Sequence, residues 1–208
     1  MSQNIEVEAK FKVNNIKKVI DRLKASGAKL NWVSTIEDYY YTPKHRDLWK
    51  IGDALRVRII KGKKGGILTY KPSGKRVQKI FVHKEHETYI ENPKQLMRIF
   101  SYLDIVPLPG LYVKKTRYDY TCGEFDIVID RYPSVGTFIE IEKMAHSKLE
   151  VQAAKKKINE FSKRLGFSDK DRQEVSVVVL IREAYLKKEK NNKFDSMIDN
   201  QIKLEKVL

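Results

Sequence analysis

Acidic or basic residues recur two positions apart in five separate segments of this 208-residue chain. The segments contain Glu6/Glu8/Lys10, Arg56/Arg58, Glu85/Glu87, Lys115/Arg117 and Glu140/Glu142. Alternate side chains of a β-strand share one face, so each segment predicts a strand with one charged face. The residues between the charges are apolar, as in the series Ile5, Val7, Ala9 and Phe11, and they require a core on the opposite face.

Pairs of like charge favour the inside of a β-barrel over a solvent-exposed sheet surface. A face in bulk water usually carries Thr, Ser and Gln as well as charges, whereas these faces carry pairs of acids and pairs of bases. The ordered set is much harder to reach by chance than one motif such as Glu6-x-Glu8-x-Lys10. We therefore predict an α+β protein built around a barrel with a charged interior, and a solvated charged surface is the alternative.

Six basic residues would line this interior: Lys10, Arg56, Arg58, Lys71, Lys115 and Arg117. So many cations would repel one another strongly in an empty barrel, which predicts that the interior binds a polyanion.

The carboxylates on the same faces supply hard oxygen ligands, which suit Mg²⁺ or Mn²⁺ rather than zinc. They are Glu6, Glu8, Asp130, Glu140 and Glu142. Bases for phosphate oxygens, together with carboxylates for a divalent cation, are what phosphoryl transfer requires. The sequence has no Gly-x-x-x-x-Gly-Lys-Ser/Thr loop, so side chains on strands would perform this chemistry.

The formal net charge of +15 indicates an anionic partner, and nucleic acid, anionic lipid and polyphosphorylated small molecules all qualify. Lysine runs at 61–64, 155–157 and 187–193 are more typical of hydrated surfaces than of binding patches. The single cysteine, Cys122, excludes an intrachain disulfide and favours a reducing, cytoplasmic setting. The longest apolar run, Val177 to Ile181, is too short to span a bilayer, so we expect no membrane partner.

The apolar periodicity predicts one domain over residues 1–186. Helices are expected at 16–26, 93–103 and 151–165, with capping residues Asn14 or Asn15, Asn92 and Ser147. Strands are expected at 5–11, 30–42, 55–58, 67–71 and 79–90. Pro107, Pro109 and Gly110 are expected to end the region of the second helix, and three more strands follow at 112–120, 124–130 and 137–144. Residues 169–186 favour a helix, although the run Val175 to Val179 is also typical of a strand. Residues 187–208 form a polar tail, helical or loose.

As an ordered set, these motifs resemble the CYTH superfamily, also called triphosphate tunnel metalloenzymes. The matching motifs are Glu6-x-Glu8-x-Lys10, Leu55-Arg56-x-Arg58, Leu68-Thr-Tyr-Lys71, Glu85-x-Glu87, Lys115-x-Arg117, Asp130 and Gly136-x-Phe-x-Glu140-Ile-Glu142. The resemblance runs from residue 5 to about residue 166, and the opening motif and the spacing of Asp130 look most like the class IV adenylate cyclase branch. One departure is that many members carry a Ser-Tyr motif in the last helix, where this chain reads Gln173-Glu-Val-Ser176.

The resemblance implies a closed, eight-stranded antiparallel barrel that forms a tunnel, dependence on Mg²⁺ or Mn²⁺, and a triphosphate substrate lying along the tunnel. It also implies that the six basic residues named above bind phosphates. Glu6, Glu8, Asp130, Glu140 and Glu142 would hold the metals, directly or through water. Glu85 and Glu87 would line the tunnel.

Three functions are compatible with these residues. A class IV adenylate cyclase would convert ATP to cyclic AMP and pyrophosphate, whereas a triphosphatase would hydrolyse tripolyphosphate, thiamine triphosphate or a nucleoside triphosphate. The third is a non-enzymatic binder of RNA or polyphosphate. The chain lacks recognised nucleic-acid motifs, which argues against nucleic acid as the partner. A homodimer is a compatible assembly.

Overall fold

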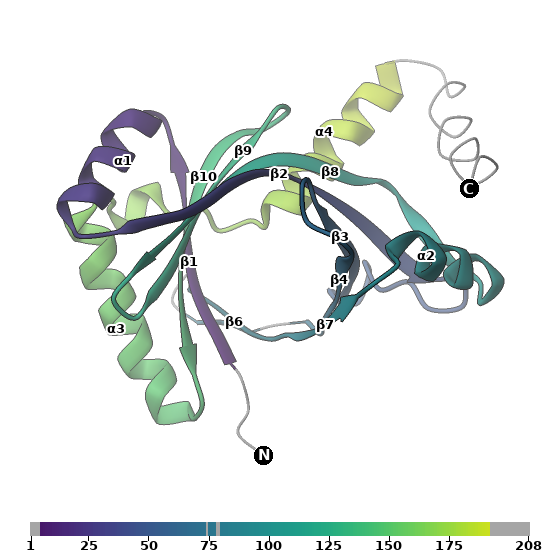
Figure 1. Ribbon diagram of the computed structural model, residues 1–208, viewed down its shortest axis with the longest axis horizontal. Helices are drawn as coiled ribbons and strands as arrows, with labels where there is room; N and C mark the ends of the chain where they lie inside the picture. Colours follow the sequence, from purple (N-terminus) through teal and green to yellow (C-terminus); the bar gives the residue numbers. More distant parts are fainter. Residues whose placement is uncertain (1–4, 74, 78–79, 192–208) are drawn as a thin grey trace.

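The computed structural model describes residues 5–73, 75–77 and 80–191 and contains one curled antiparallel sheet with helices packed against it (Figure 1). The strands are β1 (Ile5–Val13), β2 (Lys29–Pro43), β3 (Ala54–Ile60), β4 (Gly66–Lys71), β5 (Lys75–Val77), β6 (Ile80–Lys84), β7 (His86–Ile90), β8 (Ile105–Cys122), β9 (Phe125–Tyr132) and β10 (Gly136–Ala145). The helices are α1 (Ile16–Ala25), α2 (Pro93–Tyr102), α3 (Lys148–Arg164), the 3₁₀ turn η1 (Asp169–Asp171) and α4 (Val177–Asn191). This arrangement confirms the predicted α+β class.

The sheet curls into a tunnel, but its ladder is not closed by hydrogen bonds in the described residues. The strand order is β5-β6-β1-β10-β9-β8-β2-β3-β4-β7, so β7 ends the ladder on one side, whereas β6 lies near its other end, with only the three-residue β5 beyond it. Only Glu85 separates these two strands along the chain, and Figure 1 shows them following one another from beside β1 to beside β4. The tunnel is therefore completed by one continuous chain segment, which pairs with β1 before Glu85 and with β4 after it.

Three sequence-based expectations are corrected here. The sheet has ten described strands instead of eight, and the strand predicted at 79–90 is two strands, because β6 pairs with β1 whereas β7 pairs with β4. One straight strand cannot bond both edges of a curled sheet. The break expected at Pro107, Pro109 and Gly110 lies inside β8, where the register against β2 shifts between Tyr39 and Tyr41. This irregularity accommodates prolines that a regular central strand would exclude.

The main hydrophobic core lies outside the tunnel, between the sheet and helices α1 and α3. It contains fully buried residues of β1, β9 and β10, such as Phe11, Ile129 and Ile141, packed against Leu23 and Phe161. Each large apolar side chain buried in this way stabilises the fold by about 1.5–3 kcal/mol. The apolar positions of these strands that belong to this core are thus held outward, which places the alternating charged positions inward.

The predicted capping residues are confirmed, although α3 begins at Lys148 instead of the expected residue 151. Asn15 accepts a hydrogen bond from the backbone of Lys18 at 3.0 Å, Asn92 caps α2, and Ser147 with Glu150 caps α3. No helix among the described residues is long and apolar enough to cross a membrane.

Helix α4 resolves the ambiguity in the Val-rich run. The backbone N–H of Gln173 donates to the carbonyl oxygen of Lys10 at 2.8 Å, before the helix starts. The helix begins at Val177 and packs against β8. It continues past residue 186 to Asn191, so it includes the start of the predicted tail. The rest of that tail, 192–208, lies outside the described residues.

Candidate active site

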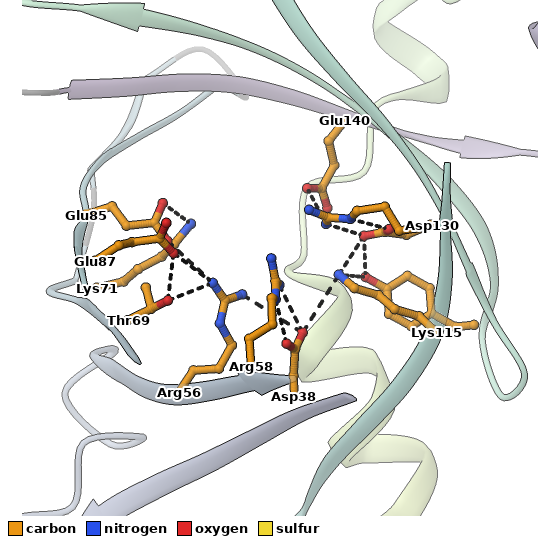
Figure 2. Close-up of polar contacts among 12 residues, drawn as sticks. Asp38, Arg56, Arg58, Thr69, Lys71, Glu85, Glu87, Lys115, Asp130 and Glu140 are labelled. Carbon is orange, nitrogen blue, oxygen red and sulfur yellow. Dashed lines mark hydrogen bonds and ion pairs between the residues drawn. The ribbon is translucent and has the colours of Figure 1, made fainter. Parts of the chain in front are cut away.

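The charged residues of six strands converge on one cavity of about 690 Å³. All six predicted phosphate-binding residues line it, together with Glu8, Asp38, Thr69 and Glu140. Figure 2 shows several of these side chains, among them Arg56, Lys71 and Lys115, pointing into the tunnel. The alternation seen in the sequence is therefore sufficient to bring these residues together once the outer faces are buried.

Lys10 and Glu140 join β1 to β10, where their Cα atoms are register partners. The Lys10 Nζ lies 2.8 Å from Glu140 Oε1 and 3.5 Å from Glu8 Oε1. Burial opposes the ionised forms of both groups, but the mutual attraction outweighs it. The pKa of Lys10 is raised, and the pKa of Glu140 is lowered to about 2, with Lys10 the main charge responsible.

Asp130 on β9 is fully buried and accepts bonds from two of the predicted phosphate-binding residues. Arg117 Nε and Nη2 lie 2.7 and 2.6 Å from its two oxygens, and Lys115 Nζ lies 2.6 Å from Oδ2. The Tyr132 hydroxyl also donates to it at 3.2 Å. Burial would raise the pKa of Asp130, but the two cations hold it far below its usual range. Burial and the charge of Arg117 lower the pKa of Lys115 to about 8.

Asp38 on β2 was missed by the sequence reasoning. It accepts both Arg58 Nε at 2.7 Å and Arg58 Nη2 at 3.0 Å, and only 1% of its surface is exposed. An aspartate inside an aromatic strand was the one signal present in the sequence. Its meaning depends on the pairing of β2 with β3, which sets Asp38 directly opposite Arg58.

Glu85 and Glu87 face the tunnel from the chain segment that completes it. Arg56 Nη2 lies 3.5 Å from Glu85 Oε1 and 3.4 Å from Glu87 Oε1, and Lys71 Nζ lies 3.0 Å from Glu85 Oε2 and 3.1 Å from Glu6 Oε2. Burial and the charge of Glu6 raise the pKa of Glu85 to about 7. Burial also opposes ionisation of Glu6, yet Lys71 lowers its pKa to about 2.

Glu6, Glu8 and Glu142 form a cluster of three carboxylates. One oxygen from each lies within 4.8 Å of the others. Burial and the neighbouring carboxylates raise the pKa of Glu8 and of Glu142, in Glu8 against the opposing charge of Lys10. A set of hard, crowded and mutually repelling oxygens fits Mg²⁺ or Mn²⁺. Of the five predicted ligands, Asp130 and Glu140 lie outside this cluster, where Asp130 contacts Lys115 and Glu140 contacts Lys10.

The ion pairs form a nearly complete ring of alternating charge around the tunnel. Consecutive members approach within 2.6–4.0 Å in the order Lys10, Glu140, Arg117, Asp130, Lys115, Asp38, Arg56, Glu85, Lys71 and Glu6, and Glu8 returns to Lys10. The alternation fails between Glu6 and Glu8, at the carboxylate cluster. The strong repulsion expected in an empty interior is therefore largely offset, because each of the six basic residues has a carboxylate partner.

One wall of the cavity is apolar. Trp49, Leu108, Val113 and Val177 line it beside Tyr40, and the guanidinium of Arg182 on α4 lies over the Trp49 ring at 4.4 Å. This wall is continuous with the charged ring because both border the same cavity. The cavity can thus accommodate a ligand with a polyanionic part and an organic part.

The comparisons with known proteins agree with this geometry. The family model described as the CYTH domain matches residues 4–176. The chain belongs to the CYTH family. A relative named putative adenylate cyclase, from Methanocaldococcus jannaschii, is 31% identical over 183 residues, which cover 88% of this chain and 97% of the relative.

Solved structures show the same CYTH fold. A Pyrococcus horikoshii protein has a TM-score of 0.75 at 27% identity, covering 86% of this chain and 98% of its own. A Vibrio parahaemolyticus protein named putative adenylate cyclase has a TM-score of 0.75 at 20% identity, with 86% and 99% covered. A Hippeastrum protein described as a putative adenylyl cyclase with dominant triphosphatase activity has a TM-score of 0.60 at 16% identity, with 86% and 95% covered.

Proposed function

We propose that this protein is a metal-dependent enzyme that acts on an organic triphosphate, and that its reaction is the conversion of ATP to cyclic AMP and pyrophosphate. The observation that carries the proposal is the ring of alternating charge, whose one interruption is the cluster of Glu6, Glu8 and Glu142. A triphosphate can replace carboxylates as the partner of the basic residues, and a divalent cation can neutralise the cluster.

The basic residues would bind and orient the phosphates. Arg56, Arg58 and Arg117 present planar guanidinium groups that suit phosphate oxygens, and Lys10, Lys71 and Lys115 add point charges. In the cyclase reaction the ribose 3′-oxygen bonds to the α-phosphorus as the α–β bridging bond breaks. Pyrophosphate leaves, and the hydroxyl proton passes to water or to a tunnel carboxylate. The cations would stabilise the negative charge on the leaving group.

Glu6, Glu8 and Glu142 are the residues proposed to hold Mg²⁺ or Mn²⁺. When bound, the cation would neutralise phosphate charge and polarise a phosphoryl oxygen. Asp130 and Glu140 would not bind the metal directly. They would hold in place the lysine and arginine groups that they contact. Glu85 and Glu87 would hold Lys71 and Arg56 until phosphate replaces them.

The apolar wall supports ATP over inorganic tripolyphosphate, because a purine base can pack against Trp49 and Val177. The name of the archaeal relative supports the cyclase in particular.

Hydrolysis by a triphosphatase is the second candidate. It is favoured by one observation, that the Lys71 and Glu85 side chains beside the carboxylate cluster are 26% and 19% exposed. Water can therefore reach the γ-phosphate of a substrate at this position.

The deciding experiment is product analysis with ATP, tripolyphosphate and thiamine triphosphate, each with Mg²⁺ or Mn²⁺ and with EDTA as a control. Cyclic AMP with pyrophosphate supports the cyclase, whereas orthophosphate release that EDTA abolishes supports the triphosphatase. Absence of turnover from all three substrates contradicts the proposed enzyme and leaves a polyphosphate or RNA binder. Binding of RNA would then weaken steeply with salt.

A further inference from the structure

Asp38 is a buried anion at the centre of the phosphate-binding residues. It lies within 4.0 Å of three of them, on the two strands that flank β2: its oxygens are 2.7 Å from Arg58 Nε and 4.0 Å from Arg56 Nη1 on β3, and 3.8 Å from Lys115 Nζ on β8. No other carboxylate among the described residues contacts both arginines of β3. Figure 2 shows Asp38 between Arg58 and Lys115.

The contact with Arg58 is two-pronged and set by the backbone. Asp38 and Arg58 are register partners of β2 and β3, and both side chains point into the cavity. The contact uses two of the five N–H donors of the guanidinium and fixes its plane. Since Arg58 also lines the cavity, its remaining donors are available to a ligand.

The carboxylate form of Asp38 persists at neutral pH. Burial opposes its ionisation, but the charges of Arg58, Arg56 and Lys115 hold its pKa well below the usual range. A permanent negative charge beside three phosphate-binding cations has two effects. It holds them in place, and it also offsets part of their attraction for a polyanion.

We propose that Asp38 is a positioning residue, which aligns Arg58 for the transferring phosphoryl group at some cost in affinity for the triphosphate. The inference rests on the proposed function, because it assigns Arg58 a role in turnover. Asp38 does not itself touch the substrate, since a carboxylate would repel phosphate oxygens. It acts through the arginine and through Lys115.

Asp38→Asn tests this role by a comparison of kcat with KM. The amide keeps the size of the side chain and loses the charge that holds the guanidinium, so kcat should fall about tenfold to a hundredfold. KM should stay the same or fall, because the tunnel becomes more positive. A merely structural defect would reduce the active fraction without tightening the binding of the triphosphate.

Glu37→Gln is the matched control. Glu37 is the preceding residue on β2 and points to the outer side of the sheet, where its Oε1 lies 3.3 Å from Lys114 Nζ. Its kcat and KM should stay within twofold of the wild type. The active fraction of each variant is measured as the stoichiometry of tripolyphosphate binding by calorimetry.

Two results would overturn the inference. One is a folded Asp38→Asn variant with a kcat within twofold of the wild type, and the other is a loss of kcat/KM that comes from a higher KM alone. If Asp38→Asn does not fold, Arg58→Lys carries the test: it keeps both charges and removes the two-pronged contact. It should lower kcat about tenfold or more, and an unchanged kcat would refute the role.

A spectroscopic measurement separates this inference from the proposed function. In the wild type the Arg58 Nε–H should give an NMR signal protected from exchange by Asp38, identified by its loss in Arg58→Lys. Asp38→Asn should shift this signal and speed its exchange, and an unchanged signal would refute the contact. A wild type that turns over no triphosphate would refute the proposed function instead, while this signal still shows whether Asp38 holds Arg58.

Discussion

The two sides of the tunnel handle buried charge in opposite ways. On the side formed by β2, β3, β8 and β9, which we call the paired wall, Asp38 and Asp130 hold Arg58, Lys115 and Arg117 at 2.6–3.8 Å. On the opposite side, the carboxylate cluster of Glu6, Glu8 and Glu142 crowds like charges together. The paired wall resembles a structural ion-pair network. In the cluster, the carboxylates crowd one another although Lys71 and Lys10 contact Glu6 and Glu8.

The two sides would therefore bind their ligands in different ways. On the paired wall, phosphate oxygens would replace carboxylates as partners of the cations, whereas the cluster would take up an additional metal ion. A phosphate approaching the paired wall meets cations that are already held, so little reorganisation is needed when it binds. The cluster still contains repelling carboxylates, which raise the pKa values of Glu8 and Glu142, so protons or a bound cation would stabilise it. Three predictions test this contrast.

The largest expected effect is on stability, from Asp130→Asn in the paired wall. The substitution removes the charge that compensates Arg117 and Lys115, so the free energy of unfolding should fall by about 3–5 kcal/mol. Denaturant unfolding measures it. Asp126→Asn, at an exposed position on the same strand, is the control and should change stability by about 0.5 kcal/mol or less. Equal effects of the two variants would show that the paired wall is not a structural network.

The next effect is on turnover, from Glu142→Gln in the cluster. Glu142 makes no ion pair among the described residues, so its loss should leave the ring intact. Metal-dependent turnover should fall about a hundredfold to a thousandfold, since a bound cation contributes several kcal/mol to such reactions. Glu124→Gln, which removes a carboxylate paired with Lys143 and Lys157 outside the tunnel, is the control. Turnover retained by Glu142→Gln would mean that the cation binds elsewhere.

The smallest effect is a pH dependence of stabilisation by Mg²⁺. Because the pKa values of Glu8 and Glu142 are raised above 4.5, the folded protein holds protons there that the unfolded chain has lost. Stability without metal therefore falls as the pH rises above about 4.5, and Mg²⁺ replaces these protons better at pH 8 than at pH 5.5. At about 100 times its dissociation constant, Mg²⁺ should add about 2.7 kcal/mol, or about 5–10 °C in Tm.

Calorimetric scans at the two pH values, with Mg²⁺ or EDTA, measure this stabilisation. Glu142→Gln should lose most of the difference between them. A metal-induced rise in Tm that is equal at both pH values would contradict the assignment of the cluster.

The sequence was sufficient for the faces of the strands. Apolar residues such as Val7, Ala9 and Ile141 must be buried, and the period of two then fixes where Glu8 and Glu140 point. The helix starts were equally local, because Asn15, Asn92 and Ser147 cap them through contacts within three residues. The ordered motifs were sufficient to indicate the CYTH family.

The pairing of charges was not local. Asp38 contacts Arg58 because β2 and β3 align these two positions, and a shift of the register by one residue would separate them. Sequence reasoning counted the cations without their partners and so expected an interior that repels itself. It also predicted one strand at 79–90. The change of pairing partner at Glu85, from β1 to β4, depends on the curl of the whole sheet and leaves no local signal in the sequence.

By itself, then, the sequence determined which residues are charged, which face of each strand they occupy and which kind of chemistry they suit. Those properties follow from residue type and a period of two along one strand. Only the tertiary structure decided that each base has a carboxylate partner and that Glu6, Glu8 and Glu142 come together in one carboxylate cluster. Distances between strands are set by register and curvature, which arise from the packing of the whole sheet against its helices.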